Sequence, residues 1–253
     1  MKTDLTDITF LILVRLDSIE RLENIVAVAN SLVQYFCTNV VVVEAAAYNN
    51  HALEKMLDRK IAYTFVEDKD PVLHKTKYYN QMALEANTPF LSIWDADTVV
   101  DKEPIQKAVS HLRDGSADVA FPFNGYFMET SDILRSYYLE KRDVKILYRH
   151  QNKLTLLYDK SIVGGAVLFS KEKFISIGMD NEKHYGWGND DYDRFYRFRN
   201  AGLEIYNTGN CLFHLSHPRS INSFYRSAIQ ESISKDEVRR TDSKSKEEIL
   251  SEL

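Results

Sequence analysis

The sequence contains very little cysteine. Its 253 residues include only Cys37 and Cys211, and no C-x-x-C pair occurs. This scarcity excludes a disulfide-stabilised scaffold and a cysteine-rich zinc module, and it fits a reducing compartment.

Long hydrophobic runs are also missing. The N-terminal residues are polar and acidic, and the apolar run Ile8–Val14 ends at Arg15 with no positively charged segment before it. A membrane-spanning helix needs about 20 apolar residues, and a secretory signal carries basic residues ahead of its apolar core. We therefore expect a cytoplasmic protein without a membrane span.

The chain has no excess of positive charge and no glycine-rich phosphate loop. Its formal net charge is −5 and its pI is near 5.8, which argues against a sequence-independent nucleic-acid binder. No G-x-G-x-x-G or G-x-x-x-x-G-K-[ST] motif follows a predicted strand, so a Rossmann dehydrogenase and a P-loop NTPase are disfavoured.

What the sequence does contain is an alternation of strand and helix patterns. Apolar, β-branched runs typical of buried strands alternate with segments whose apolar residues recur at helical spacing. The predicted strands are Ile8–Val14, Val40–Val43, Ile61–Phe65 and Phe90–Trp94, and the predicted helices are 20–36, 51–58 and 76–86. This order predicts an α/β fold with a mostly parallel central sheet flanked by helices.

We divide the chain into one domain, residues 1–231, and a C-terminal segment, residues 232–253. The C-terminal segment is dominated by charged residues and serine, which predicts a solvated helix or a frayed tail. Within the domain, the tyrosine-rich stretch 133–158 is predicted to be an excursion from the sheet. Its tyrosines could bind sugar faces, but packing is favoured because tyrosine is commonly half buried.

Polar side chains follow the predicted strands at their carboxyl ends. Arg15 and Asp17 follow the first strand, and Glu44 follows the second. Ligands of open parallel sheets bind beyond these ends. Each residue alone could be an ordinary loop or capping residue, but together they predict a nucleotide-sized cleft.

Two aspartates, Asp95 and Asp97, come directly after the strand Phe90–Trp94. Along an extended backbone, residues i and i+2 point to the same side, so these carboxylates can converge on one point. Close carboxylates repel each other unless a proton or a cation lies between them. Mg²⁺ and Mn²⁺ prefer such oxygen ligands and often share them with a substrate phosphate. A D-x-D also occurs by chance in acidic turns, so it is weak evidence alone.

A second acidic motif opens a predicted helix. Gly186-Trp187-Gly188 is followed by Asp190, Asp191 and Asp193. The glycines permit unusual backbone angles, and the tryptophan offers a flat apolar face. An acidic first turn complements the helix dipole, but this explains only one or two of the acids.

Two further pairs of residues lie beside predicted apolar strands. Gly164 and Gly165 precede the strand that ends at Ser170, and adjacent glycines allow close approach of a ligand or of another backbone. His214 and His217 are three residues apart and could bind a borderline metal ion. Either histidine could equally be an ordinary polar residue.

Together, these motifs resemble the GT-A glycosyltransferases, and specifically the β-1,4-galactosyltransferase-like C-terminal region that bacterial family-2 chondroitin- and capsule-type transferases share. That family carries an apolar strand ending in D-x-D, then F-G-G-x-x-x-x-S-K, then G-W-G-x-E-D-x-D, and then H-x-x-H or M-x-x-H. The same order stands here between about residues 73 and 217, as Trp94-Asp95-Ala96-Asp97, Val163-Gly164-Gly165 through Ser170-Lys171, Gly186–Asp193 and His214–His217.

The resemblance implies a metal site and a catalytic carboxylate. By the family pattern, Asp97, His214 and His217 would hold Mn²⁺ or Mg²⁺. Asp191 stands at the position of the catalytic base, and Asp190 at an acceptor-binding position.

The resemblance also implies which residues contact the donor. Trp187, Gly164 and Gly165 would line the sugar site. Asp95 would contact the ribose or a neighbouring basic group, and Lys75 would lie near the diphosphate. Arg15, Asp17 and Glu44, which were identified from the strand ends, complete the predicted nucleotide site.

The chain departs from the family pattern at three positions. Asp190 replaces a glutamate, Asn189 replaces a glycine, and Lys75 stands where arginine is common. The shorter acid at position 190 leaves more room beside it, so the acceptor is not specified.

The resemblance predicts a metal-dependent inverting glycosyltransferase. It would move a hexose or N-acetylhexosamine from a UDP-sugar to a saccharide acceptor, in bacterial surface polysaccharide synthesis. One alternative is a sugar nucleotidyltransferase, which usually has an N-terminal phosphate loop rich in glycine and lysine. The other is a non-catalytic carbohydrate-binding protein of the same fold.

Overall fold

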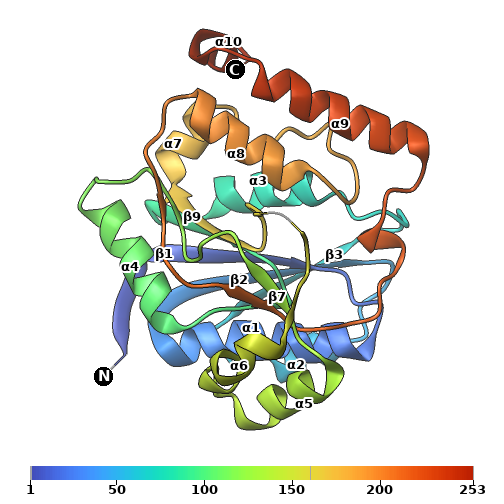
Figure 1. Ribbon diagram of the computed structural model, residues 1–253. Helices are drawn as coiled ribbons and strands as arrows, with labels where there is room; N and C mark the ends of the chain where they lie inside the picture. Colours follow the sequence, from blue (N-terminus) through green and yellow to red (C-terminus); the bar gives the residue numbers. More distant parts are fainter. Residues whose placement is uncertain (1, 160, 253) are drawn as a thin grey trace.

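A seven-stranded sheet forms the centre of the protein, seen in a computed structural model that describes residues 2–159 and 161–252 (Figure 1). Its strands are β1 Thr3–Val14, β2 Phe36–Ala46, β3 Ala62–Glu67, β4 Phe90–Trp94, β6 Val119–Phe121, β9 Ala166–Ser170 and β10 Ile205–Asn207. They lie in the order β10-β6-β9-β4-β1-β2-β3. Only β9 runs antiparallel to its neighbours, β4 and β6. The predicted α/β class with a mostly parallel sheet is confirmed.

The first two strands are longer than the apolar runs that predict them. Ile8–Val14 is buried throughout, as in a strand covered on both faces. The polar residues before it also join the ladder, and Thr3 lies opposite Phe36 of β2. Backbone hydrogen bonds continue beyond the run of buried side chains. Hydrophobicity therefore underestimates the length of both strands.

Helices cover both faces of this sheet. The helices in the described part of the chain are α1 Ile19–Tyr35, α2 Ala52–Met56, α3 Lys75–Glu85, α4 Lys102–Arg113, α5 Asp132–Lys141, α6 Lys145–His150, α7 Lys171–Ser176, α8 Asp190–Asn200, α9 Ala228–Asp242 and α10 Lys246–Leu250. Helix α1 lies on one face, and α3, α7 and α8 lie on the other (Figure 1). The Ser18 hydroxyl caps α1 by accepting a hydrogen bond from the Arg21 N–H, which satisfies one free donor of the first turn.

A second, four-stranded sheet has the order β5-β11-β7-β8. Its strands are β5 Thr98–Val99, β7 Phe127–Glu129, β8 Thr155–Leu156 and β11 Leu212–His214. The stretch predicted to be an excursion supplies α5, α6, a 3-10 helix at Gln151–Lys153 and β8. Tyr138 in this stretch is buried, in agreement with packing, whereas Tyr137 is exposed. The small sheet matters because it joins β5, just after Asp97, to β11.

The charged C-terminal segment is not a separate tail. It forms α9 and α10, and α9 begins at Ala228, so the predicted boundary at residue 231 falls inside a helix. Helix α9 lies across α8 (Figure 1). The buried Thr241 hydroxyl donates to Asp193 of α8 over 2.8 Å. Composition alone did not reveal this docking, because polar side chains make the contact.

No helix in the described part of the chain has the length and the apolar character that crossing a bilayer requires.

Candidate active site

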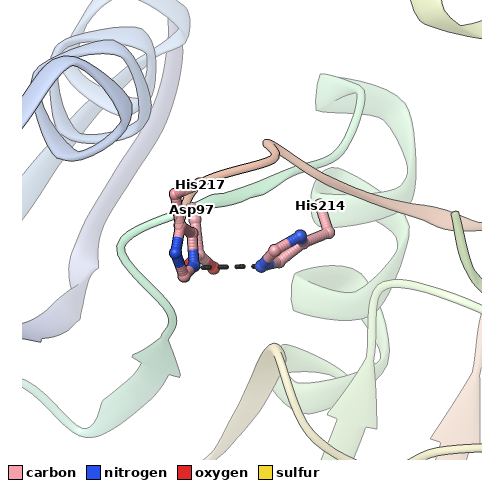
Figure 2. Close-up of side chains that lie close together, drawn as sticks. All are labelled: Asp97, His214 and His217. Atoms are coloured by element: carbon pink, nitrogen blue, oxygen red, sulfur yellow. Dashed lines mark hydrogen bonds and ion pairs between the residues drawn. The ribbon is translucent and has the colours of Figure 1, made fainter. Parts of the chain in front are cut away.

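Asp97, His214 and His217 point toward one another (Figure 2). One potential ligand atom from each side chain lies within 4.8 Å of the other two. Nε2 of His217 is 3.0 Å from Oδ2 of Asp97, and Nε2 of His214 is 3.6 Å from the same oxygen. One carboxylate and two imidazoles therefore share a small volume.

The small sheet brings these residues together. Asp97 directly precedes β5, and β5 pairs with β11 so that Thr98 lies opposite His214. The Leu215 N–H donates to the Asp97 carbonyl oxygen over 2.9 Å, which fixes the residue after β11 against the same turn. His217 then follows on the segment that leaves the sheet.

Both imidazoles are oriented by acceptors on their outer nitrogens. Nδ1 of His214 lies 2.7 Å from Oε2 of Glu129, and Nδ1 of His217 lies 2.9 Å from the Pro218 carbonyl oxygen. Because these oxygens accept, each Nδ1 carries the proton, and each Nε2 faces Asp97. Metal-bound histidines have this arrangement, in which a carboxylate or a carbonyl fixes the tautomer. The donor set therefore fits a divalent cation.

The members of the cluster also shift each other's pKa. Burial alone would raise the pKa of Asp97, but His214 and His217 hold it well below its usual range. Burial alone would lower the pKa of His214, but Asp97 and Glu129 raise it to about 9. The carboxylate is thus ionised and ready to accept a cation, which would replace a proton of the cluster.

Asp95 does not join Asp97 at one point, contrary to the expectation from extended geometry. The Thr98 N–H donates to the Asp95 carbonyl oxygen over 3.2 Å, so residues 95–98 form a turn rather than a continued strand. The two side chains consequently have different neighbours. Burial raises the pKa of Asp95 to about 7, although the nearby Lys75 opposes this shift. Asp95 therefore holds its proton more tightly than a solvated aspartic acid does.

Two adjoining cavities open at this site, and Lys75, Asp95, Phe127, Tyr158 and Trp187 line both. The residues that line only the first include Asp97, His214, His217, Arg15, Arg21 and Arg219. Those that line only the second include Gly164, Gly165, Asp190, Asp191, Tyr192 and Tyr225. The first cavity thus combines the metal-ligand cluster with cations, which suits a polyanion. The second combines carboxylates with aromatic rings.

The acid pair occupies the start of α8. Asn189 precedes the helix with a left-handed φ of 66°, and Asp190 and Asp191 follow. Asp190 is buried, with Lys75 Nζ 3.2 Å from its Oδ2. The side chain of Asp191 is 27% exposed, against 3% for Asp190. Asp191 is therefore the acid that a ligand reaches more easily.

Both glycines before β9 are required by close contacts. Gly165 has φ +91°, and a Cβ there would lie 3.0 Å from Leu212 Cδ1 and 3.1 Å from Phe127 Cε1. A Cβ on Gly164 would lie 2.4 Å from Oδ2 of Asp191. The absence of side chains at 164 and 165 thus keeps the wall of the second cavity close to the acid.

Two of the predicted nucleotide-binding residues lie outside both cavities. Asp17 pairs with Arg21 over 2.9 Å and accepts a hydrogen bond from the Ser220 hydroxyl. Glu44 is buried and accepts a hydrogen bond from the Tyr63 hydroxyl over 2.7 Å. The end of a strand determines at which edge of the sheet a residue lies, but not which way its side chain points.

The remaining prediction from the strand ends, Arg15, does line the first cavity. Its guanidinium is held by the Ala45 carbonyl at 2.8 Å and by Asp68 at 2.6 Å. Arg15 therefore contributes a fixed positive charge to the wall of the cavity.

Sequence analysis did not identify Arg21, Glu129 and Arg219, and it included Tyr158 only within a stretch whose tyrosines could bind sugar faces. Arg21 resembles a surface residue of a predicted helix, yet one of its nitrogens lies 3.9 Å from Asp97 Oδ2. Glu129 reaches His214 only through the register of β7 and β11. Arg219, two residues after His217, could have been found from its proximity to that motif.

Part of the chain matches a known family by sequence, and the whole fold resembles known structures. Residues 149–221 match the family model described as the N-terminal domain of galactosyltransferase. Among solved structures, the chain is similar to the catalytic domain of Drosophila β1,4-galactosyltransferase 7 in complex with xylobiose. Their sequence identity is 15% and the TM-score is 0.55, over 96% of this chain and 82% of that chain.

The chain is also similar to the mannosyltransferase PcManGT from Pyrobaculum calidifontis in complex with GDP-Man and Mn²⁺. Here the identity is 17% and the TM-score is 0.55, over 85% of this chain and 58% of that chain. No curated protein matches by sequence. The chain therefore has the fold of GT-A glycosyltransferases, as the resemblance implied.

Proposed function

We propose that this protein is a metal-dependent inverting glycosyltransferase. It transfers a hexose or N-acetylhexosamine from a UDP-sugar to a saccharide acceptor. By the same family resemblance, we propose a role in surface polysaccharide synthesis. One observation carries the proposal: the cluster of Asp97, His214 and His217 lines a cavity that adjoins the one lined by Asp190 and Asp191.

The first cavity would bind the nucleoside diphosphate. Arg15, Arg21, Lys75 and Arg219 supply positive charge around it, and guanidinium groups bind phosphate oxygens in bidentate geometry. A divalent cation held by Asp97, His214 and His217 would offset the negative charge that develops on the departing diphosphate. The Mn²⁺ in the mannosyltransferase complex supports a cation in this role.

The second cavity would bind the sugar and the acceptor. Trp187 is a wall of both cavities and meets the Tyr225 ring edge to face, with 5.3 Å between the centroids. Aromatic faces of this kind contact the apolar faces of sugars. The xylobiose in the β1,4-galactosyltransferase 7 complex supports a saccharide ligand.

The chemical step would be a single displacement with Asp191 as the base. The acceptor oxygen bonds to the anomeric carbon while the bond from that carbon to the diphosphate oxygen breaks. The hydroxyl proton passes to Asp191, and UDP leaves with the electron pair. A hydroxyl is a weak nucleophile, so a carboxylate that takes its proton during attack accelerates the reaction.

Thermal-shift measurements test this proposal. Each nucleotide-sugar of a panel is added with Mn²⁺, and GDP-mannose is included as an alternative donor. A ligand at 100 times its Kd stabilises the folded state by about 2.7 kcal/mol, or about 5–10 °C in Tm for a protein of this size. We expect UDP-sugars to give this shift.

The product of the best donor should have the inverted anomeric configuration by NMR. Release of pyrophosphate from UTP and a sugar 1-phosphate, without release of UDP from the panel, would indicate a nucleotidyltransferase. No turnover in either assay would indicate a binding protein.

A further inference from the structure

Each acid at the start of α8 has its own cation. Lys75 pairs with Asp190, whereas Arg194, one turn further along α8, pairs with Asp191. Nη1 of Arg194 donates to Oδ1 of Asp191 over 2.8 Å. The Arg194 side chain is only 3% exposed.

A second acid anchors Arg194 from the other side. Nε and Nη2 of Arg194 donate to the two carboxylate oxygens of Asp180, each over 2.7 Å. The backbone of Asp180 is fixed in turn by Asn80 of α3. The Asp180 N–H donates to Asn80 Oδ1, and Asn80 Nδ2 donates to the Asp180 carbonyl oxygen, both over 2.9 Å. The guanidinium is therefore locked in place before it contacts Asp191.

This geometry assigns different roles to the two oxygens of Asp191. Oδ1 is held by Arg194, while Oδ2 lies toward Gly164, where a Cβ would meet it at 2.4 Å. Only arginine presents three donors in a rigid fork that can hold two carboxylates at once, because the lysine ammonium is a single point charge. The contact thus fixes the rotation of the Asp191 carboxylate and leaves one oxygen for the cavity.

From these contacts, we infer that Arg194 is a positioning residue for Asp191: it holds Oδ1 so that Oδ2 faces the acceptor hydroxyl. The inference rests on the proposed function, in which Asp191 accepts the proton of that hydroxyl. A misplacement of about 1 Å can cost about 10²-fold in rate. The transfer rate should therefore depend on the orientation of the Asp191 carboxylate.

Arg197 provides a matched control on the same helix. Its guanidinium is also buried, and it donates to Asp193 over 3.1 Å and to Glu252 over 2.8 Å, without a contact to the acid pair. Replacement of either arginine disturbs a buried ion pair of an α8 side chain. Only the loss of the Arg194 fork should disturb Asp191.

The test compares Arg194→Lys with Arg197→Lys. The rate of UDP release is measured with Mn²⁺, N-acetylglucosamine and an equimolar mixture of UDP-glucose, UDP-galactose and their N-acetyl forms. We expect Arg194→Lys to lower the maximal rate about 10- to 100-fold, with an unchanged Kd for UDP and Mn²⁺ by calorimetry. Arg197→Lys should stay within about threefold of the wild type. If Arg194→Lys fails to fold, Asp180→Asn tests the same anchor, with the same expected loss of rate.

A double-mutant cycle separates positioning from general support of the fold. If Arg194 acts through Asp191, Arg194→Lys should cause no further loss in an Asp191→Asn background. An equal loss in both backgrounds, an unchanged rate in Arg194→Lys, or a parallel weakening of UDP binding would overturn the inference. Failure of the proposed function would look different, because wild type and Asp191→Asn would then release UDP at the same rate.

Discussion

At the scale of single residues, the site depends on neighbours that hold each functional atom in place. Glu129 and the Pro218 carbonyl direct the Nε2 atoms of His214 and His217 toward Asp97. The acids that face the second cavity are each held by a cation in the same way. The reactive side chains and Lys75 could be named from their motifs, whereas Glu129 and Arg194 could not.

Removal of the proposed base tests the chemistry directly. Asp191→Asn keeps the size of the side chain but removes its capacity to accept a proton. We expect the transfer rate to fall by at least about 100-fold, the lower end for lost general-base catalysis, with donor binding retained. The measurement is steady-state transfer with the donor identified by the panel. Turnover near the wild-type rate would exclude Asp191 from this role.

Glu129 tests whether the support of His214 matters for the metal. Glu129→Gln keeps a hydrogen-bond acceptor but removes the charge beside Nδ1. Changes of this kind cost about 10- to 100-fold in metal affinity, so we expect Mn²⁺ to bind correspondingly more weakly in calorimetry. Glu172→Gln, an exposed change on α7, serves as the control. Equal Mn²⁺ affinity in both variants would mean that His214 needs no such support.

The difference between predicted and observed residues has a physical explanation. Asp97, His214 and His217 could be identified because metal ligands need particular side chains at particular spacings. Glu129 could not, since it reaches His214 only through the pairing of β7 with β11. Glu44 was misplaced because a strand end does not determine which way its side chain points.

At the scale of elements, close contacts constrain the two glycines that precede β9. Gly165 fills the space beside Leu212 and Phe127, and its carbonyl oxygen accepts from the Asp95 N–H over 2.8 Å. Gly164 lies against Asp191. A strand from the central sheet thus connects the aspartate turn with the acid pair of α8.

Gly164→Ala isolates this contact. The φ of Gly164 suits any residue, so the backbone tolerates alanine, but the new Cβ would overlap the Asp191 carboxylate. We expect the folded protein to lose some stability, because Asp191 must shift against Arg194. The transfer rate should fall at least about 10-fold, since displaced catalytic groups lose rate steeply. Gly209→Ala, where a Cβ has nothing within 4 Å, is the matched control. A rate loss of the same size in both variants would contradict this account.

The elements also mark where sequence patterns lose precision. Continuous apolar runs predict the cores of β1 and β2, because burial on both faces requires them. The two-residue strands β5 and β8 have no such signal. β5 forms because it pairs with β11, and β8 forms because it pairs with β7. Both pairings depend on the tertiary structure.

At the scale of the whole molecule, the C-terminal helices tie the acid-bearing segment to the rest of the fold. The Ser234 hydroxyl of α9 donates to the Gly188 carbonyl oxygen over 2.8 Å and lies 3.2 Å from Nδ1 of His184. Nε2 of His184 lies 3.0 Å from Oδ2 of Asp193. This buried polar network makes α9 part of the domain, although its composition resembles that of a tail.

The network also predicts a pH dependence of stability. Burial alone would lower the pKa of His184, but Asp193 raises it above its usual value. A raised pKa in the folded state gives stability that is fully present below pH 6.5 and is lost as the pH rises through the folded pKa. We therefore expect His184→Gln to lower the free energy of unfolding more at pH 6 than at pH 9 in urea titrations. Equal losses at both values would mean that the protonated imidazole adds nothing.

The central claim, that UDP binds through a cation at Asp97, His214 and His217, is tested most directly by isothermal titration calorimetry of UDP. We predict binding in Mn²⁺ that disappears in EDTA and weakens strongly in Asp97→Ala and His217→Ala. Undiminished affinity for UDP in EDTA would contradict the account.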